Sequence, residues 1–217
     1  MSDSRTTRRR ATYHHGDLRA ALLQAGIQLA REQGPEAVVL REATRRVGVS
    51  PNAAYRHFAD HDALLDAVCD ASQARLAEWI ERRQAELPDA DPATTARARL
   101  RAIGTAYVEF AVEEPGLFRA AFRVPADLER AHSPERAGAG GRTPFELVNA
   151  ALDEFVASGI MPARRREHAE VLAWSAVHGL AGLVTEGPLR ALPRQAVDAL
   201  TQRVVDMVEA GLTAPVT

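Results

Sequence analysis

The chain of 217 residues contains no lysine, a single cysteine (Cys69) and few aromatic residues, which make up 5% of it. One cysteine cannot form a disulfide within the chain, which fits a reducing cytoplasm. No apolar run approaches the roughly 18 residues of a membrane span, and no apolar segment follows the first arginines as in a secretory signal. Few aromatic residues and abundant alanine favour helices over strands. We therefore expect a cytoplasmic, helical protein without a membrane partner.

Charge is unevenly distributed along the chain, although the formal net charge is only −2. Residues 1–58 contain ten arginines and five acidic residues, a net charge of +5, whereas the rest contains seventeen arginines and twenty-four acidic residues, a net charge of −7. This asymmetry indicates a polyanionic partner at one end, or else a chance cluster on a solvated face. We predict a flexible basic arm over residues 1–14, in which Arg8, Arg9 and Arg10 either reach DNA or form a disordered tail.

Apolar residues recur at helical spacing along most of the chain, and no segment alternates as a strand does. Stop and cap residues divide the pattern into about nine helices. Three short helices come first, a long connecting helix ends before Pro88, and a larger bundle follows. The pattern predicts an all-α fold. Residues 126–142 are polar and rich in glycine, so we expect a mobile loop there.

The stretch VGVSPNAAYRHF, residues 47–58, predicts a tight turn between two short helices. Gly48 can adopt the left-handed backbone of such a turn, Ser50 is suited to cap the next helix, and Pro51 suits its first position. A helical hairpin within a bundle is the alternative, but it would need a wider apolar face than this helix offers. In a helix-turn-helix, the second helix lies in the major groove of DNA. We therefore predict a DNA-binding motif.

The candidate residues of this motif differ in the part of DNA that they suit. Ser50 and Asn52 offer hydrogen-bonding groups to base edges, whereas Tyr55, Arg56 and His57 offer donors to phosphates. The complete predicted set of DNA-binding residues is Arg41, Thr44, Ser50, Pro51, Asn52, Ala54, Tyr55, Arg56, His57 and His61.

The segment LREATRRVGVSPNAAYRHFADHDALLDAV, residues 40–68, resembles the DNA-binding domain of the tetracycline-repressor (TetR) family of bacterial transcriptional regulators. In AWSAVHGLAGLV, Trp174, His178 and Gly179 resemble the C-terminal domain type named for its Trp-His-Gly signature, and YHHGDLR at 13–19 is similar to that subgroup's N-terminal sequence. The resemblance implies an all-α homodimer. Residues 15–72 would form the DNA-binding head, and residues 73–217 would bind a ligand and dimerise.

Four positions depart from the pattern that is usual in this family. Val39 stands where members carry a capping Ser or Thr, so Glu42 cannot complete a capping box, and the helix start loses about 1 kcal/mol. Thr44 replaces a small alanine, and Ala43 replaces a larger apolar residue. His61 replaces a lysine that contacts phosphate in members, and histidine carries only partial charge near neutral pH. We expect DNA affinity that is weaker, or more sensitive to pH, than is typical.

The larger bundle contains a cluster of aromatic residues that suits either a core or a ligand pocket. Four of them lie within sixteen residues, and a histidine follows Trp174 by one helical turn. A histidine in this position is also typical of a packed interface. The predicted pocket residues are Tyr107, Phe110, Phe118, Phe122, Trp174 and His178.

The last two long helices carry broad apolar stripes that predict a dimer interface. Two such helix pairs can form a four-helix bundle between subunits, and the resulting twofold symmetry matches a palindromic operator. The predicted interface residues are Leu172, Val177, Leu180, Val184, Val197, Leu200, Val204, Met207 and Val208.

Signatures of catalysis and of metal binding are missing from the sequence. It has no nucleophile elbow, phosphate-binding glycine loop, paired-cysteine zinc site or HExxH motif, so we predict no catalytic residue, metal or cofactor. Adjacent His14 and His15 diverge, and Cys69, without a nearby histidine or arginine to lower its pKa, is expected to be inert.

We predict a repressor released from DNA by a small apolar ligand. A ligand-independent or activating DNA-binding protein of the same fold is the alternative, and an enzyme is not expected.

Overall fold

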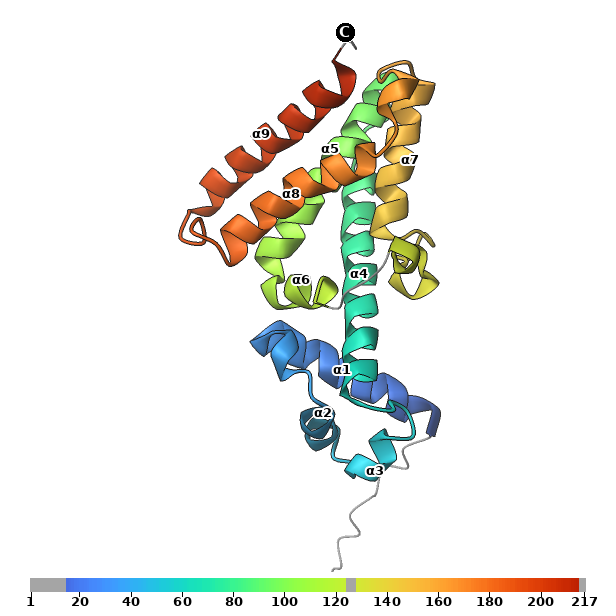
Figure 1. Cartoon of the computed structure of the whole chain (residues 1–217), viewed down its shortest axis with the longest axis vertical. Coiled ribbons are helices and arrows are strands. Elements are labelled where there is room, and N and C mark those ends of the chain that lie inside the picture. Colours follow the sequence, from blue (N-terminus) through green and yellow to red (C-terminus); the bar gives the residue numbers. More distant parts are fainter. Residues whose placement is uncertain (1–14, 124–127, 215–217) are drawn as a thin grey trace, which may run out of the picture.

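The computed structural model describes residues 15–123 and 128–214. These residues form nine α-helices and four short 3-10 helices and contain no strand, so the predicted all-α class is confirmed. Figure 1 shows an elongated molecule with a small N-terminal head at one end and a larger C-terminal body at the other. No helix in the described ranges is long and apolar enough to cross a membrane. The predicted basic arm, residues 1–14, lies outside the described residues.

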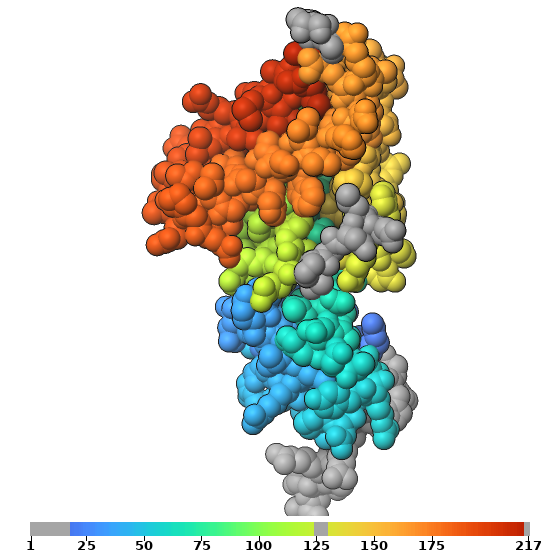
Figure 2. Space-filling view, viewed as in Figure 1, coloured from blue at the N-terminus to red at the C-terminus, as the bar shows by residue number. Residues whose placement is uncertain are grey.

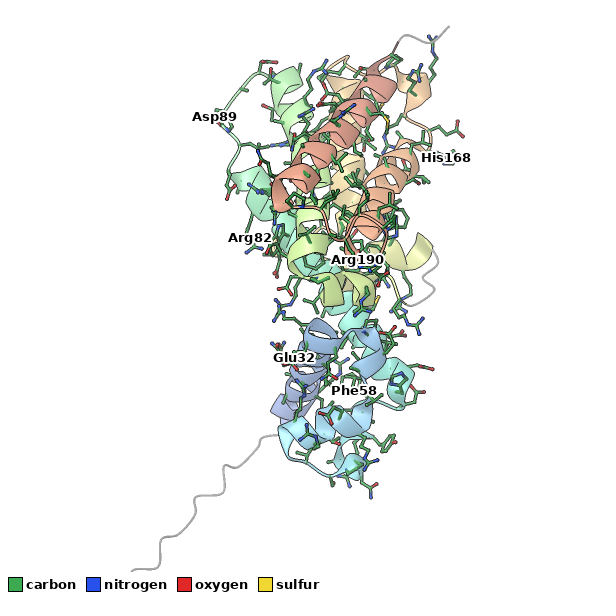
Figure 3. The ribbon with its side chains drawn as sticks, turned by 90° about the vertical axis from the view of Figure 1, so that its left-hand side faces the viewer. Glu32, Phe58, Arg82, Asp89, His168 and Arg190 are labelled. Carbon is green, nitrogen blue, oxygen red and sulfur yellow. The ribbon has the colours of Figure 1, made fainter. Side chains whose placement is uncertain are left out.

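The head is built from three helices on the first part of a fourth. They are α1 (His15–Gln33), α2 (Leu40–Val47), α3 (Pro51–Ala54) and α4 (His61–Ala85). Leu22, Leu29 and Leu64 are completely buried between α1 and α4. Phe58, labelled in Figure 3, is also buried, and the Arg19 guanidinium lies 5.1 Å from the centre of its ring. These contacts fix α2 and α3 at the end of the molecule.

Helix α4 continues from the head into the body (Figure 1). The Asp60 carboxylate caps its start by accepting the Ala63 N–H at 2.8 Å. Its first half packs on α1, and its second half packs on helices of the body. The predicted boundary between residues 72 and 73 falls within this helix. A displacement in the body can therefore reach the head through one continuous element.

The body consists of α5 (Pro92–Glu113), α6 (Pro115–Ala121), α7 (Pro144–Ala157), α8 (Ala169–Thr185) and α9 (Arg194–Thr213). Asp91 caps α5 before a proline in its first position, and Thr143 and Glu146 form a complete capping box at α7. Helices α8 and α9 pack side by side across α5. Figure 2 shows that they form one broad face of the body.

The segment expected to be a mobile loop is held against α4 wherever it is described. It contains the 3-10 helices Leu128–His132 and Pro134–Arg136. The Arg136 Nε–H donates to the Asp70 carboxylate at 2.8 Å, and the Gly140 N–H donates to the Glu81 carboxylate at 3.1 Å. For residues 128–142 the expectation of a mobile loop is thus wrong, because acidic residues of α4 bind a segment whose composition resembles a free loop.

Candidate functional site

The turn between α2 and α3 has the backbone geometry that the sequence predicts. Gly48 is left-handed, with φ of 77° and ψ of 31°, and its N–H donates to the Thr44 carbonyl at 2.9 Å. Ser50 is the N-cap residue of α3 and Pro51 is its first residue, but the Ser50 side chain makes no capping hydrogen bond. The exposed Ser50 hydroxyl is therefore available to another partner.

Most of the predicted DNA-binding residues are accessible on the head. Arg41, Ser50, Pro51, Asn52, Tyr55, Arg56 and His61 are exposed, and His57 is half-buried. Thr44 and Ala54 are buried instead, and the Thr44 hydroxyl donates to the Arg41 carbonyl at 2.8 Å. The prediction that these two side chains contact DNA is wrong, because each short helix buries one face in the core of the head.

The arginines of the head fall into two groups by their ion pairs. Arg45 binds the Glu42 carboxylate through two hydrogen bonds of 2.8 and 2.6 Å, and Arg46 binds Glu32 at 2.8 Å. Hydrogen bonding from Arg45 lowers the pKa of Glu42 to about 2. Arg41 and Arg56, in contrast, form no ion pair with any described residue. Their full charge is therefore available to phosphates.

Helix α2 begins without a side-chain cap, as the sequence predicts. Val39 is its N-cap residue, and no side chain satisfies the free backbone N–H groups at this end. Glu42, which would have completed a capping box, forms ion pairs with Arg45 and Arg46 instead. His61 is exposed at the first position of α4, between Asp60 and Asp62. The two neighbouring carboxylates reduce the attraction of this position for phosphate.

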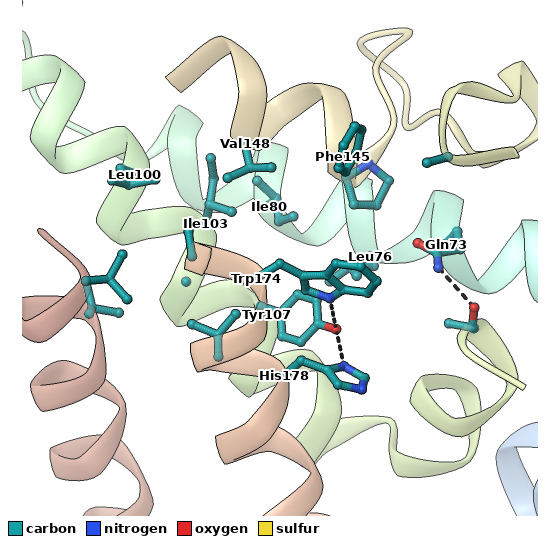
Figure 4. Close-up of a pocket in the computed structure, with 18 of the residues that line it drawn as sticks. Gln73, Leu76, Ile80, Leu100, Ile103, Tyr107, Phe145, Val148, Trp174 and His178 are labelled. Atoms are coloured by element: carbon teal, nitrogen blue, oxygen red, sulfur yellow. Dashed lines mark hydrogen bonds between the residues drawn. The ribbon is translucent and has the colours of Figure 1, made fainter. Parts of the chain in front are cut away.

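The body encloses a cavity of about 410 Å³ between α4, α5, α7, α8 and α9, with the end of α6 and the two 3-10 helices of residues 128–136 at its edge. Its wall is mainly apolar, as the close-up in Figure 4 shows. The principal apolar residues are Leu76, Ile80, Leu100, Ile103, Phe145 and Val148. This size is typical of small-molecule sites in proteins.

A chain of three polar side chains crosses one side of this cavity (Figure 4). The Trp174 Nε1–H donates to the Tyr107 hydroxyl at 3.0 Å, and the same hydroxyl lies 2.7 Å from His178 Nδ1. With the proton of neutral His178 on its second nitrogen, the Tyr107 hydroxyl donates to Nδ1; with the proton on Nδ1, the hydroxyl accepts instead. Burial lowers the pKa of His178 and raises that of Tyr107, so both side chains are uncharged at neutral pH.

Four of the six predicted pocket residues line the cavity, namely Tyr107, Phe122, Trp174 and His178. Phe118 lies behind this wall, with its ring 5.6 Å from that of Tyr107. Phe110 points elsewhere, against Trp79 at 5.8 Å between ring centres. Its assignment to the pocket is wrong, because its ring packs edge-on against Trp79 of α4 and does not line the cavity.

Sequence reasoning missed the part of the wall that comes from α4, from α7 and from the segment before α7. Leu76 and Ile80 have the same helical spacing as core residues, so no sequence signal separates them from the core. Arg136 lies in the segment expected to be a loop, yet it is buried and belongs to the cavity wall.

Two family models match the chain, and together they cover both the head and the body. The model described as "Bacterial regulatory proteins, tetR family" matches residues 22–68, and the model described as "Tetracyclin repressor-like, C-terminal domain" matches residues 100–208. The chain belongs to the TetR family. The second match includes Trp174, His178 and Gly179.

Curated relatives of this TetR-family chain are similar to it over a limited stretch. The HTH-type transcriptional repressor Rv3405c of Mycobacterium tuberculosis and the HTH-type transcriptional regulator Mb3439c of Mycobacterium bovis are each 37% identical over 75 residues. The matched stretch is 35% of this chain and 40% of either relative's length.

Solved structures are similar over nearly the whole chain. A protein with unknown function from Rhodococcus sp. RHA1 has a TM-score of 0.71 and 29% identity, covering 94% of this chain and 100% of its own. A TetR-family transcriptional regulator from Pectobacterium atrosepticum has a TM-score of 0.64 and 22% identity, covering 96% and 100%. The transcriptional regulator FadR from Bacillus subtilis, in complex with stearoyl-CoA, has a TM-score of 0.65 and 14% identity, covering 88% and 98%. The last two support the fold alone.

TetR regulators bind DNA and form dimers, so the exposed apolar residues of the body are of interest. Of the predicted interface residues, Leu172 and Met207 are exposed, with fractions of 67% and 62%, and Leu200, Val204 and Val208 are half-buried. Val177, Leu180, Val184 and Val197 are buried within the subunit. Their assignment to the interface is wrong, because α8 and α9 turn their more apolar sides toward α5.

The outward side of α8 carries a small apolar surface. The sequence pattern does not distinguish its residues from the apolar residues on the inner side of the helix. Leu183 is exposed there, and a side chain on Gly179 or Gly182 would meet nothing within 4 Å in the subunit. We name the residues Leu172, Gly179, Leu183 and Met207 the outer α8–α9 surface. Small residues between exposed apolar ones allow another helix to approach closely.

Cys69 is buried on α4, and its thiol donates to the Ala121 carbonyl at 3.2 Å. Contrary to expectation an arginine is near, since the Arg136 Nη2 lies 3.9 Å from the sulfur. Burial outweighs this charge and raises the pKa of the thiol. A protonated, buried thiol is unreactive. No group of three metal-ligating side chains occurs among the residues that the structure describes.

Proposed function

We propose that this TetR-family chain is a homodimeric repressor that binds a palindromic operator and is released by a small apolar effector. The observation that carries the proposal is that one chain combines a helix-turn-helix, beside which Arg41 and Arg56 form no ion pair with a described residue, with an apolar cavity that lies beside the helices leading to the head. The function is therefore binding and its regulation rather than catalysis.

The head would read DNA with α3 in the major groove. Asn52 and Ser50 lie at the start of this helix, where side chains reach base edges. Arg41, Tyr55 and Arg56 surround it and suit phosphates, and all three are exposed. One relative, matched over 75 residues, is named a repressor, which supports negative regulation.

The outer α8–α9 surface would form the dimer interface. A twofold axis through it would place the same residues of two subunits against each other and produce a four-helix bundle. Two heads related by that axis would meet successive major grooves, as a palindromic operator requires.

The cavity would bind the effector and change the spacing of the heads. Its wall includes Gln73, Leu76 and Ile80 of α4, and Ala121 and Phe122 at the end of α6. Both helices also contact α1 of the head. An effector that binds better to a conformer with wrongly spaced heads shifts the population away from DNA. A protein of this fold, FadR, has been solved in complex with stearoyl-CoA, which supports an effector with a long alkyl chain.

The proposal is tested by selecting DNA that the purified protein binds from fragments of its host genome and then measuring binding by fluorescence anisotropy. Apolar compounds that bind the protein are added to the complex, and calorimetry measures the affinity of each with and without operator. Linkage requires that operator weakens effector binding by the same factor, with a typical coupling of about 1 to 3 kcal/mol. If the protein binds no DNA sequence specifically, the DNA-binding assignment is overturned. Equal effector affinity in both titrations favours the ligand-independent alternative, and an activated target promoter favours an activator.

A further inference from the structure

Arg136 is a buried cation in the cavity wall, and most of its hydrogen-bond donors are unused. It is 3% exposed. Its Nε–H donates to the Asp70 carboxylate at 2.8 Å, and its Nη2 lies 3.9 Å from the sulfur of Cys69. Among the described residues Nη1 has no hydrogen-bond partner, and neither terminal nitrogen donates to a carboxylate. A guanidinium has five N–H donors, so several remain for a ligand.

The carboxylate that compensates this guanidinium is shared with a second arginine. Asp70 also accepts two hydrogen bonds from Arg130 Nη2, at 3.0 and 3.2 Å. Arg130 binds Asp66 as well, at 3.3 Å. Arg136 therefore receives only part of the negative charge of one carboxylate, although it is the more deeply buried of the two arginines.

The other arginine in the cavity wall, Arg101, is arranged differently. Its Nη1 lies 2.7 Å from an Asp206 carboxylate oxygen and 3.1 Å from a Glu209 oxygen, and its Nη2 donates to Gln202 at 3.2 Å. Two carboxylates of α9 thus compensate its charge. Of the two arginines in the wall, Arg136 is the one whose terminal nitrogens bind no carboxylate.

We propose that the effector is an apolar acid, with an alkyl or aryl body and one carboxylate that binds the terminal nitrogens of Arg136. This inference rests on the proposed function, since it specifies the ligand class of the same cavity. An anion enters an apolar cavity only when a cation there replaces its hydration, and the planar guanidinium suits a carboxylate. The apolar body would lie against Leu76, Ile80 and Val148, which form much of the remaining wall.

The test compares decanoate with decanol, which share an alkyl chain and differ in the charge at one end. Isothermal titration calorimetry of the full chain at neutral pH measures both affinities. We expect decanoate to bind at least about tenfold more tightly, since hydrogen bonds to charged groups are the stronger ones. Equal affinity for the two probes would overturn the anionic class and leave the proposed function intact. Failure of both probes to bind overturns this inference and contradicts the effector part of the proposed function, whereas the DNA-binding part is decided by the anisotropy measurements.

Two variants locate the charge that is responsible. Arg136→Gln should abolish the preference for decanoate while decanol binding persists, whereas Asp70→Asn should increase the preference, because it removes the competing carboxylate. Arg99→Gln is the matched control; Arg99 lies on α5 outside the cavity wall and pairs with Glu154. Opposite changes at residues 136 and 70 cannot come from misfolding alone, and thermal melts verify that each variant is folded. An unchanged preference in both variants overturns the role of Arg136.

Discussion

Arg31 of the head and Glu114 of the body form an ion pair with two hydrogen bonds. The Arg31 Nε–H donates to Glu114 Oε2 at 2.7 Å, and Nη2 donates to Oε1 at 2.9 Å. Glu114 directly precedes α6, and the far end of α6 contributes Ala121 to the cavity wall. The pair therefore lies on a direct route from the cavity to the DNA-binding head, in addition to the route through α4.

Removing the charge of Glu114 should loosen this contact. Glu114→Gln is expected to lower the free energy of unfolding by about 1 kcal/mol, because the pair is partly buried and has two charge-assisted hydrogen bonds. Urea denaturation measures the change. Glu86→Gln is the control, since Glu86 is exposed and pairs with Arg83 at 3.4 Å; we expect a loss below about 0.5 kcal/mol there. Equal losses in the two variants would contradict a special role for the Arg31–Glu114 pair.

Gly116 brings α6 against the backbone of α1. A methyl group at this position would lie 2.1 Å from the Ala30 carbonyl oxygen, and a backbone oxygen cannot turn aside as a side chain can. Gly116→Ala should therefore cost about 1–3 kcal/mol of stability and separate head from body. At Gly26 the added methyl would meet side-chain atoms and no backbone, the nearest being a methyl group of Val68 at 2.8 Å, so Gly26→Ala should cost less. Chemical denaturation of both variants checks the order, and the reverse order would contradict a close approach of α6 to α1.

Mildly acidic conditions should destabilise the chain of polar residues in the cavity wall. Burial lowers the pKa of His178 below its unfolded value of about 6.5. As pH falls through that value, the unfolded chain binds a proton more readily than the folded chain does, so stability decreases until the lower folded pKa is reached. His178→Gln should reduce this dependence of the melting temperature on pH. An identical dependence in the variant would show that His178 does not titrate differently in the two states.

Local backbone chemistry explains which features could be predicted from the sequence. Gly48 can take a left-handed conformation that other residues avoid, and Val39 has no oxygen with which to cap a helix, so their behaviour follows from residue type. Which face of a short helix is buried does not follow from residue type. Thr44 is buried because α2 packs on α1, and that packing depends on residues far along the chain.

The cavity could be predicted only in part for a similar reason. Tyr107 and Trp174 were found because aromatic residues are rare in this chain and their clustering is visible. Leu76 was not, since an aliphatic residue beside a cavity has the same sequence pattern as one in a filled core. Arg136 was missed because its partner Asp70 is 66 positions away, and the glycine-rich segment around it has the composition of a loop.

The outer α8–α9 surface should hold the dimer together. Leu172→Asp combined with Met207→Asp places charges at two largely exposed positions, so the fold of the subunit should survive while association is lost. Light scattering should then give the monomer mass, with helicity unchanged. Tyr55→Ala removes a side chain of similar exposure, 56%, from the head and should leave the dimer intact. A dimer that persists in the double variant would place the interface elsewhere.

Arg41 and Arg56, which form no ion pair with a described residue, should account for much of the electrostatic affinity for DNA. Arg41→Ala and Arg56→Ala are expected to weaken binding to all sequences alike and to reduce the slope of log affinity against log salt by about 1 for each phosphate that is no longer bound. Arg45 pairs with Glu42, so Arg45→Ala is the matched control and should change the slope less. Asn52→Ala should instead reduce discrimination between bases, by about 1–3 kcal/mol at one position. Anisotropy titrations at several salt concentrations, on selected and scrambled DNA, distinguish these effects. If Arg45→Ala lowered the slope as much as Arg41→Ala and Arg56→Ala, the ion pairs of the free head would not determine which arginines meet phosphate.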